Sequence, residues 1–133
     1  MQVIKLNTVS RNWEMWGHHP SERQRLFDLI GSTKANGVVF ISGDMHFAEI
    51  FRTKEGPYPL YDITASGLDQ DYKTSGTFKA PSEQVGKSHL KRHFGGIVID
   101  WEKAALNLEI RDIKGERQLH QEIKLSDLQV PAE

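Results

Sequence analysis

The sequence contains no cysteine, which excludes disulfide bonds, zinc sites built from thiolates and cysteine nucleophiles. It also lacks an excess of charge of either sign. The 17 Lys and Arg face 18 Asp and Glu, so the formal net charge is −1. A protein that binds nucleic acid or an anionic membrane normally carries a basic excess or patch. We therefore expect neither nucleic acid nor a membrane among the partners.

Long apolar runs are missing as well. No stretch approaches the roughly 20 apolar residues that cross a bilayer, and the first residues lack the apolar segment of a secretory signal. We expect no transmembrane segment and no signal peptide in this chain, which leaves its compartment unknown. A chain of 133 residues has the size of one small domain. We predict a single domain over residues 1–133, with a leading segment at 1–20 and a frayed tail at 126–133.

Residues 37–50, GVVFISGDMHFAEI, join an apolar run to a polar cluster. Residues 38–41 are β-branched or aromatic, which predicts a strand buried on both faces. Polar residues follow at its end, where the loops of α/β sheets commonly carry functional side chains. Asp44 and His46 could share one metal ion there, or face different ions of a two-metal site. The alternative is a turn-forming Asp beside a half-buried His.

A helix is predicted before this stretch. Ser21 can cap it after Pro20, and Gln24 stands where it completes a capping box. Apolar side chains at 26, 27, 29 and 30 then fall on one face. The helix leads into the strand at 38–42, which is half of a βαβ unit.

Two regions with different sequence patterns make up the rest of the chain. Residues 48–52 and 60–64 are predicted strands, whereas the polar stretch 69–88 is predicted to be a long loop. In the final third, the apolar run 97–99 is a predicted strand, and apolar and polar residues alternate over 106–110 and, more loosely, over 118–125. This period of two predicts an antiparallel meander of three strands.

Four blocks follow one another in the order NW-x(4)-HHPSERQRLFDLI, GVVFISGDMHFAEI, PLYDITASGL and HFGGIVIDW. Together they resemble the C-terminal part of PhoD-like alkaline phosphatases, which are metal-dependent phosphoester hydrolases of the metallophosphoesterase group. The resemblance runs from about Asn12 to Trp101, and its most specific block is SGDMHFAEI with YDITASGL at the right distance. It implies an α/β fold, namely the C-terminal half of a metallophosphoesterase-like β-sandwich flanked by helices and ending in the antiparallel β meander.

The resemblance also implies a metal-binding hydrolase that acts on phosphate esters. His46 matches the group's last metal-ligand motif, and Asp44 stands where many relatives in the wider group carry the first His of Gly-His-x-His. Calcium and iron are the metals expected from the family, with zinc, magnesium or manganese as alternatives. Glu49 is a candidate to orient His46, or a surface carboxylate. His93 and Arg92 are candidates to contact phosphate, because cations lie near transferring phosphoryl groups, and the alternative is a solvated basic turn.

Two features depart from the family. Its other metal ligands lie in motifs of its N-terminal half, and none of these motifs occurs here. The sequence therefore indicates a fragment or one half of a split protein, inactive by itself, that needs an N-terminal partner chain or forms a homo-oligomer. A non-catalytic remnant or oligomerising interaction module is the alternative. The second departure is His93, where relatives usually show Asn before Phe-Gly.

Overall fold

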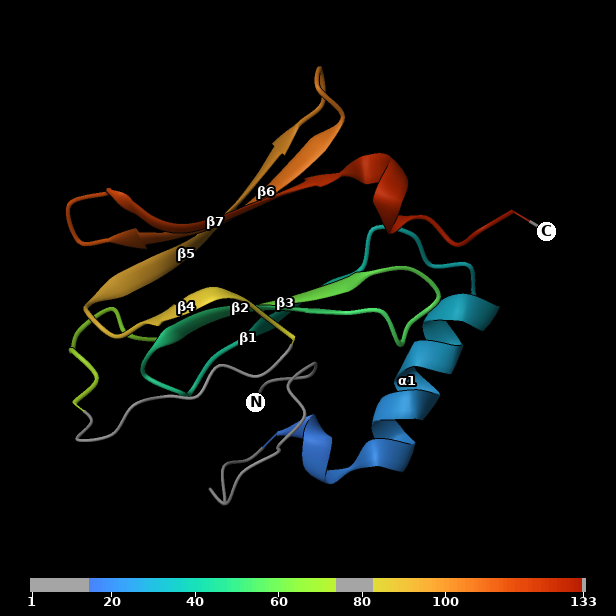
Figure 1. The fold of residues 1–133 in the computed structure, drawn as a ribbon, viewed down its shortest axis with the longest axis horizontal. Helices are drawn as coiled ribbons and strands as arrows, with labels where there is room; N and C mark the ends of the chain where they lie inside the picture. The colour runs from blue at the N-terminus through green and yellow to red at the C-terminus, as the bar shows by residue number, and fades with distance from the viewer. Residues whose placement is uncertain (1–14, 74–82, 133) are drawn as a thin grey trace.

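The computed structural model describes residues 15–73 and 83–132 (Figure 1). Within these ranges the chain forms two sheets, one α-helix and two short 3-10 helices. In chain order they are η1 (Trp16–His18), α1 (Pro20–Ser32), β1 (Val39–Ser42), β2 (Ala48–Thr53), β3 (Leu60–Ala65), β4 (Gln84–His89), β5 (His93–Asp100), β6 (Ala105–Asp112), β7 (Arg117–Lys124) and η2 (Leu125–Leu128).

The two sheets lie face to face, as Figure 1 shows. The first has the order β1-β3-β2-β4, with β1 parallel to β3 and the other pairs antiparallel. The second is the antiparallel meander β5-β6-β7, which confirms the prediction made from alternation in the final third. The described part of the chain is thus mixed α/β, mostly two antiparallel sheets with one helix, and its identity as a metallophosphoesterase fold stays a prediction.

The core lies between the sheets and extends under α1. Its best-buried apolar side chains come from β2, β3 and β6, which are the inner strands, and include Phe51, Leu60, Leu108 and Ile110. The central row of β6 is buried because its even-numbered residues face the first sheet, following the period-two geometry of a strand. No helix in the described residues is both long and apolar enough to span a membrane.

Helix α1 begins one residue earlier than predicted. Pro20 occupies its first turn, and His19 is the cap residue without a side-chain capping bond, so the predicted Ser21 cap is wrong. Proline suits the first helical position, because its fixed φ is helical and no intrahelical partner for its nitrogen is needed there. Phe27 packs on Phe40 of β1 with ring centroids 6.5 Å apart. A strand preceding α1, which would complete a βαβ unit, would fall in residues 1–14, outside the described residues.

The connection from α1 to β1 is braced by Tyr58. Its hydroxyl donates a hydrogen bond to the carbonyl oxygen of Ala35 (2.7 Å) and accepts one from the amide of Val38 (3.1 Å). Burial raises the pKa of the Tyr58 phenol, and the hydrogen bond from the Val38 amide opposes that rise. These two hydrogen bonds fix the position at which β1 begins. They therefore also fix the position of residues 43–47, which follow the carboxyl end of β1.

Three expectations about individual segments are wrong. β1 is an edge strand and is not buried on both faces, because Ile41 is 77% exposed. The predicted loop at 69–88 contains β4, although residues 74–82 lie outside the described ranges. The predicted frayed tail at 126–133 is docked in its first part, since Leu128 is fully buried and the Val130 amide donates to Asn36 Oδ1 (2.8 Å).

Candidate functional site

The loop between β1 and β2, residues 43–47, has an unusual backbone at both predicted metal ligands. Asp44 has φ +69° and His46 has φ +60°, whereas Met45 between them does not have positive φ. This left-handed region is uncommon for residues other than glycine, although Asp and His are enriched among those that adopt it. Both side chains are exposed. The loop therefore presents a carboxylate and an imidazole to solvent at the carboxyl end of β1.

His46 is held from two sides by residues that follow β3. Its backbone amide donates a hydrogen bond to Ser66 Oγ (3.0 Å), and its ring atom Nδ1 lies 2.9 Å from Nε2 of Gln70. As placed, the Gln70 amide donates to Nδ1, which leaves the proton of a neutral ring on Nε2. Turning the amide by half a rotation would let Gln70 Oε1 accept the Nδ1 proton and free the Nε2 lone pair, as a ligating histidine requires.

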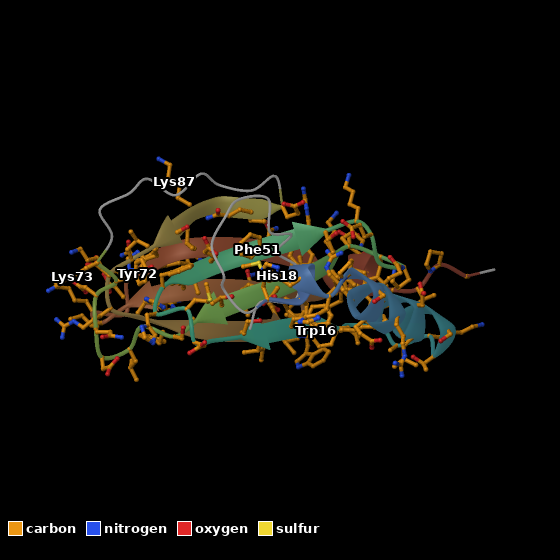
Figure 2. All side chains as sticks on the ribbon, turned by 90° about the horizontal axis from the view of Figure 1, so that it is seen from below. Trp16, His18, Phe51, Tyr72, Lys73 and Lys87 are labelled. Carbon is orange, nitrogen blue, oxygen red and sulfur yellow. The ribbon has the colours of Figure 1, made fainter. Side chains whose placement is uncertain are left out.

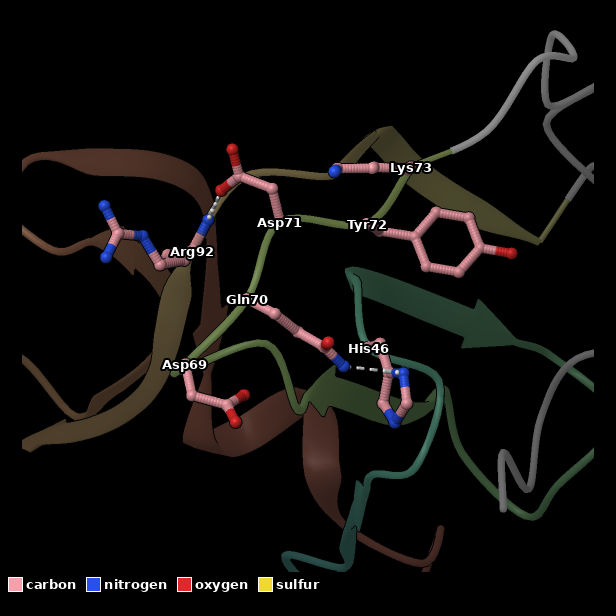
Figure 3. A pocket seen from close by; sticks show the side chains of 7 residues that line it. All are labelled: His46, Asp69, Gln70, Asp71, Tyr72, Lys73 and Arg92. Atoms are coloured by element: carbon pink, nitrogen blue, oxygen red, sulfur yellow. Dashed lines mark hydrogen bonds between the residues drawn. The ribbon is translucent and has the colours of Figure 1, made fainter.

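A shallow hollow of about 580 Å³ opens beside His46 (Figure 3). Besides His46, its walls come from residues 69–73 and from Arg92, which are Asp69, Gln70, Asp71, Tyr72, Lys73 and Arg92. Figure 2 shows Tyr72 and Lys73 at the end of the sandwich opposite α1. This is the end at which β1 delivers its loop (Figure 1). The hollow mixes two carboxylates with two cations and also includes the aromatic residue Tyr72.

Asp71 fastens the wall of the hollow to the turn before β5. One carboxylate oxygen accepts a hydrogen bond from the Arg92 amide (2.9 Å), and the other forms an ion pair with Lys91 Nζ (3.2 Å). The Arg92 amide and then the Lys91 ammonium lower the pKa of Asp71. The same wall is anchored at Tyr72, whose ring packs edge-on against buried Phe47 at 5.1 Å.

His93 lies behind the hollow with both of its ring nitrogens in use. Nε2 accepts a hydrogen bond from the Gly67 amide (3.1 Å), and Nδ1 donates to the carbonyl oxygen of Lys91 (2.7 Å). The side chain is only 1% exposed. These bonds define a neutral ring with its proton on Nδ1. Of the two residues predicted to contact phosphate, His93 is therefore enclosed, and only Arg92 lines the hollow.

Gly67 is needed where it stands. A side chain at this position would place its Cβ 2.4 Å from Cε1 of His93 and 2.9 Å from the carbonyl oxygen of His46. The backbone also pairs here, because the His93 amide donates to the Gly67 carbonyl oxygen (2.9 Å). Gly67 and His93 thus connect the loop after β3 to the start of β5, directly beneath His46.

Glu49 is buried on β2 and is not a surface carboxylate. It is 1% exposed, and its Oε1 accepts a hydrogen bond from Ser88 Oγ of β4 (2.6 Å). The ring nitrogen of His46 that a second residue could orient is held by Gln70. Sequence reasoning missed Gln70, and also Asp71, because both lie in the polar stretch predicted to be a long loop, in which no local pattern indicates a contact.

His46 and Asp44 have the chemistry to supply part of the ligand set of a metal centre. Among the described residues there is no group of three or more His, Asp or Glu side chains placed to hold a metal ion. An imidazole and a carboxylate on one loop supply two ligands, while enclosed sites use four or more in total. His46 and Asp44 could therefore hold a metal only together with ligands from elsewhere.

Comparisons with known proteins add no relative to this picture. No protein-family model, no curated protein and no solved structure matches the chain.

Proposed function

We propose that this chain contributes His46 and Asp44 to the metal centre of a PhoD-like phosphatase, a metal-dependent hydrolase of phosphate esters. The supporting observation is the β1–β2 loop, in which both candidate ligands have positive φ and project into solvent. Backbone conformations of this kind cost free energy and cluster at functional sites. The carboxylate suits calcium, magnesium, manganese or iron, and the imidazole suits iron or zinc.

The same geometry limits the activity of an isolated chain. His46 and Asp44 are two ligands, and the described residues provide no third one near them. The remaining ligands come, in this proposal, from a partner chain or from a second copy. A monomer of this chain is then expected to be inactive.

A metal held at this loop would polarise the phosphoryl group and stabilise the charge that develops on it. The chain's own residues have separate tasks. Gln70 keeps the His46 ring in one orientation, and Lys73 and Arg92 at the hollow offer positive charge to a phosphate. Arg92 directs its guanidinium away from His46 (Figure 3), so it would act at the rim. Asp71 fixes the backbone that carries Arg92.

Hydrolysis of p-nitrophenyl phosphate and of its diester tests the proposal. Each would be assayed with the purified chain after loading with calcium, iron or zinc. Activity that His46→Ala abolishes and His120→Ala leaves unchanged would support a contributed ligand. His120 is an exposed histidine on β7 that bonds Asn107, so it controls for loss of a surface imidazole. Measurable activity that is equal in the wild type and His46→Ala would contradict the proposal.

A non-catalytic interaction module is the second candidate. It is favoured by the apolar side chains left exposed along β1 and β5, which include Ile41, Ile97, Val98 and Ile99. Apolar surface of this kind commonly marks an association site. The two functions separate experimentally, because an interaction module needs no bound metal.

A further inference from the structure

The two sheets are offset by one strand, which leaves β1 uncovered on its inner face. β5 lies over β3, since a side chain at Gly95 would reach Ala65 and Ile63, and β7 lies over β4. The three strands of the second sheet therefore cover β3, β2 and β4, and none of the described strands covers β1. This leaves a step at the edge of the sandwich, where the first sheet extends one strand beyond the second.

Ile41 marks the floor of this step. It is the direct partner of Ile63 on the neighbouring parallel strand, and partners in a sheet face the same side. Ile63 lies under β5 and is 3% exposed, while Ile41 is 77% exposed. Ile41 is thus a core-facing residue at which the opposite layer is missing. Val39 faces the same way, two residues earlier.

The side of the step is the free edge of β5. Gly95 faces the first sheet, so Ile97 and Ile99 face it too, by alternation. Ile97 is 39% exposed and Ile99 is 42% exposed, although their partners on β6, Leu108 and Leu106, are buried. We define the step as Val39 and Ile41 of β1 with Ile97 and Ile99 of β5.

The other two sheet edges carry features that discourage pairing. β4 has Lys87, a glycine with φ +74° at Gly86 and a register shift against β2. β7 is densely polar and charged, with the sequence RQLHQEIK. By contrast, residues 94–99 of β5 and 39–42 of β1 have no charged side chain, and β5 pairs with β6 without a bulge. Natural proteins protect edges that must stay unpaired, so the step is the edge built to receive a strand.

We propose that a second copy of this chain fills the step. A two-fold axis that runs along β1, midway between the layers, exchanges the two layers. It places the partner's β1 beside β5 and over β1, and it places the partner's β5 beside β1. Each copy then fills the step of the other, and both sheets continue through the dimer. A two-fold interface must be self-complementary, and a step without charge meets its own copy without repulsion.

The same axis has a consequence for the site, which rests on the proposed function. Rotation about an axis parallel to the strands preserves strand direction, so both β1 strands end at the same end of the dimer. Packed layers lie about 10 Å apart, so the two loops that carry Asp44 and His46 become neighbours. Two copies would offer four donors where one copy offers two, which is enough for the three protein ligands that a catalytic site with an open position uses.

Solution mass, measured by light scattering in the presence of a chelator, tests the dimer without reference to metal. The expected mass is twice 15.2 kDa for the wild type and 15.2 kDa for Ile41→Arg. Ile113→Arg is the matched control, because Ile113 is 55% exposed in the turn after β6 and lies outside the step. Its mass should stay that of a dimer. Since Ile41 is exposed in a single copy, Ile41→Arg should still fold, with an unchanged circular-dichroism spectrum, but it should melt at a lower temperature that no longer depends on protein concentration.

A cysteine cross-link locates the interface. The chain has no cysteine, so Ile41→Cys carries a single thiol, which a short bis-maleimide should join to its counterpart across the axis. Ile113→Cys should not be joined. A monomeric wild type, a dimer that Ile41→Arg leaves intact, equal cross-linking of both variants, or association with a different chain alone would each overturn the proposal. A confirmed dimer that binds no metal would contradict only the proposed function, and the proposed dimer would stand.

Discussion

The imidazole of His93 lies 3.1 Å from the amide nitrogen of Gly67 and accepts its hydrogen bond, while its other nitrogen donates to the Lys91 carbonyl. An asparagine is shorter: its Nδ2 can take the place of Nδ1 and donate to the Lys91 carbonyl oxygen, whereas neither amide atom reaches the place of Nε2. At the position where PhoD-like phosphatases usually show Asn before Phe-Gly, the histidine of this chain therefore adds the bond to Gly67. His93 holds the loop after β3 in place beneath His46.

His93→Ala is expected to lower the free energy of unfolding by about 2–4 kcal/mol, because the buried Gly67 amide loses its partner and a cavity forms. His93→Asn should cost less, since its Nδ2 can still donate to the Lys91 carbonyl oxygen. Urea denaturation of the two variants measures the difference. If both variants were equally destabilised, the bond to Lys91 would contribute nothing measurable.

Gly67→Ala should destabilise the fold, because its Cβ would meet the His93 ring at 2.4 Å. Overpacking at a well-filled site typically costs about 1–3 kcal/mol. Combining it with His93→Asn, which removes ring volume, should restore part of the loss. Thermal melting of the single and double variants checks this, and strictly additive effects would contradict a direct clash.

At position 44 we expect the glycine variant to be more stable than the alanine variant, which is the reverse of the order at most positions. Because Asp44 has φ +69°, Asp44→Gly should be more stable than Asp44→Ala by about 1 kcal/mol. Asp69 does not have positive φ and serves as the control, where Ala should be at least as stable as Gly. Urea denaturation of the four variants tests the strain, and a more stable Asp44→Ala would show that the loop carries none.

Acidification should lower the free energy of unfolding over a pH range that is set by the titration of His89. Burial lowers the pKa of His89, because desolvation disfavours the charged ring. The unfolded chain then binds more protons than the folded one between the lowered pKa and the ordinary value of about 6.5, so stability falls as pH falls through this range. His89→Gln should remove this slope, measured by urea denaturation from about pH 8 to about pH 5. An unchanged slope would assign the loss to other groups.

The parts of the fold that the sequence predicted are those with a strong local pattern. Leu106, Leu108 and Ile110 alternate with polar residues, and they form the buried row of the meander. β4 was missed because QVGKSH has no such alternation and includes a glycine with positive φ. The apolar run before Asp44 predicted burial on both faces, but burial also depends on where the opposite sheet ends, which no local pattern records.

The candidate site, like the fold, was predicted only in part from the sequence. The sequence placed Asp44 and His46 together on a loop after a strand, and the structure agrees on their location. It did not predict Gln70 at the His46 ring or the closure of His93 on Gly67, because these contacts join segments more than 20 residues apart. A polar stretch shows that contacts are available without showing with which residue.

Whether the loop after β1 holds a metal ion is decided by the metal content of the protein. The purified chain would be incubated with iron, calcium or zinc, desalted and examined by elemental analysis beside His46→Ala, Asp44→Asn and the control His120→Ala. We expect bound metal in the wild type and in His120→Ala, its loss in His46→Ala and a weaker retention in Asp44→Asn. Equal metal in the wild type and His46→Ala, or none in any of the four, would contradict this expectation.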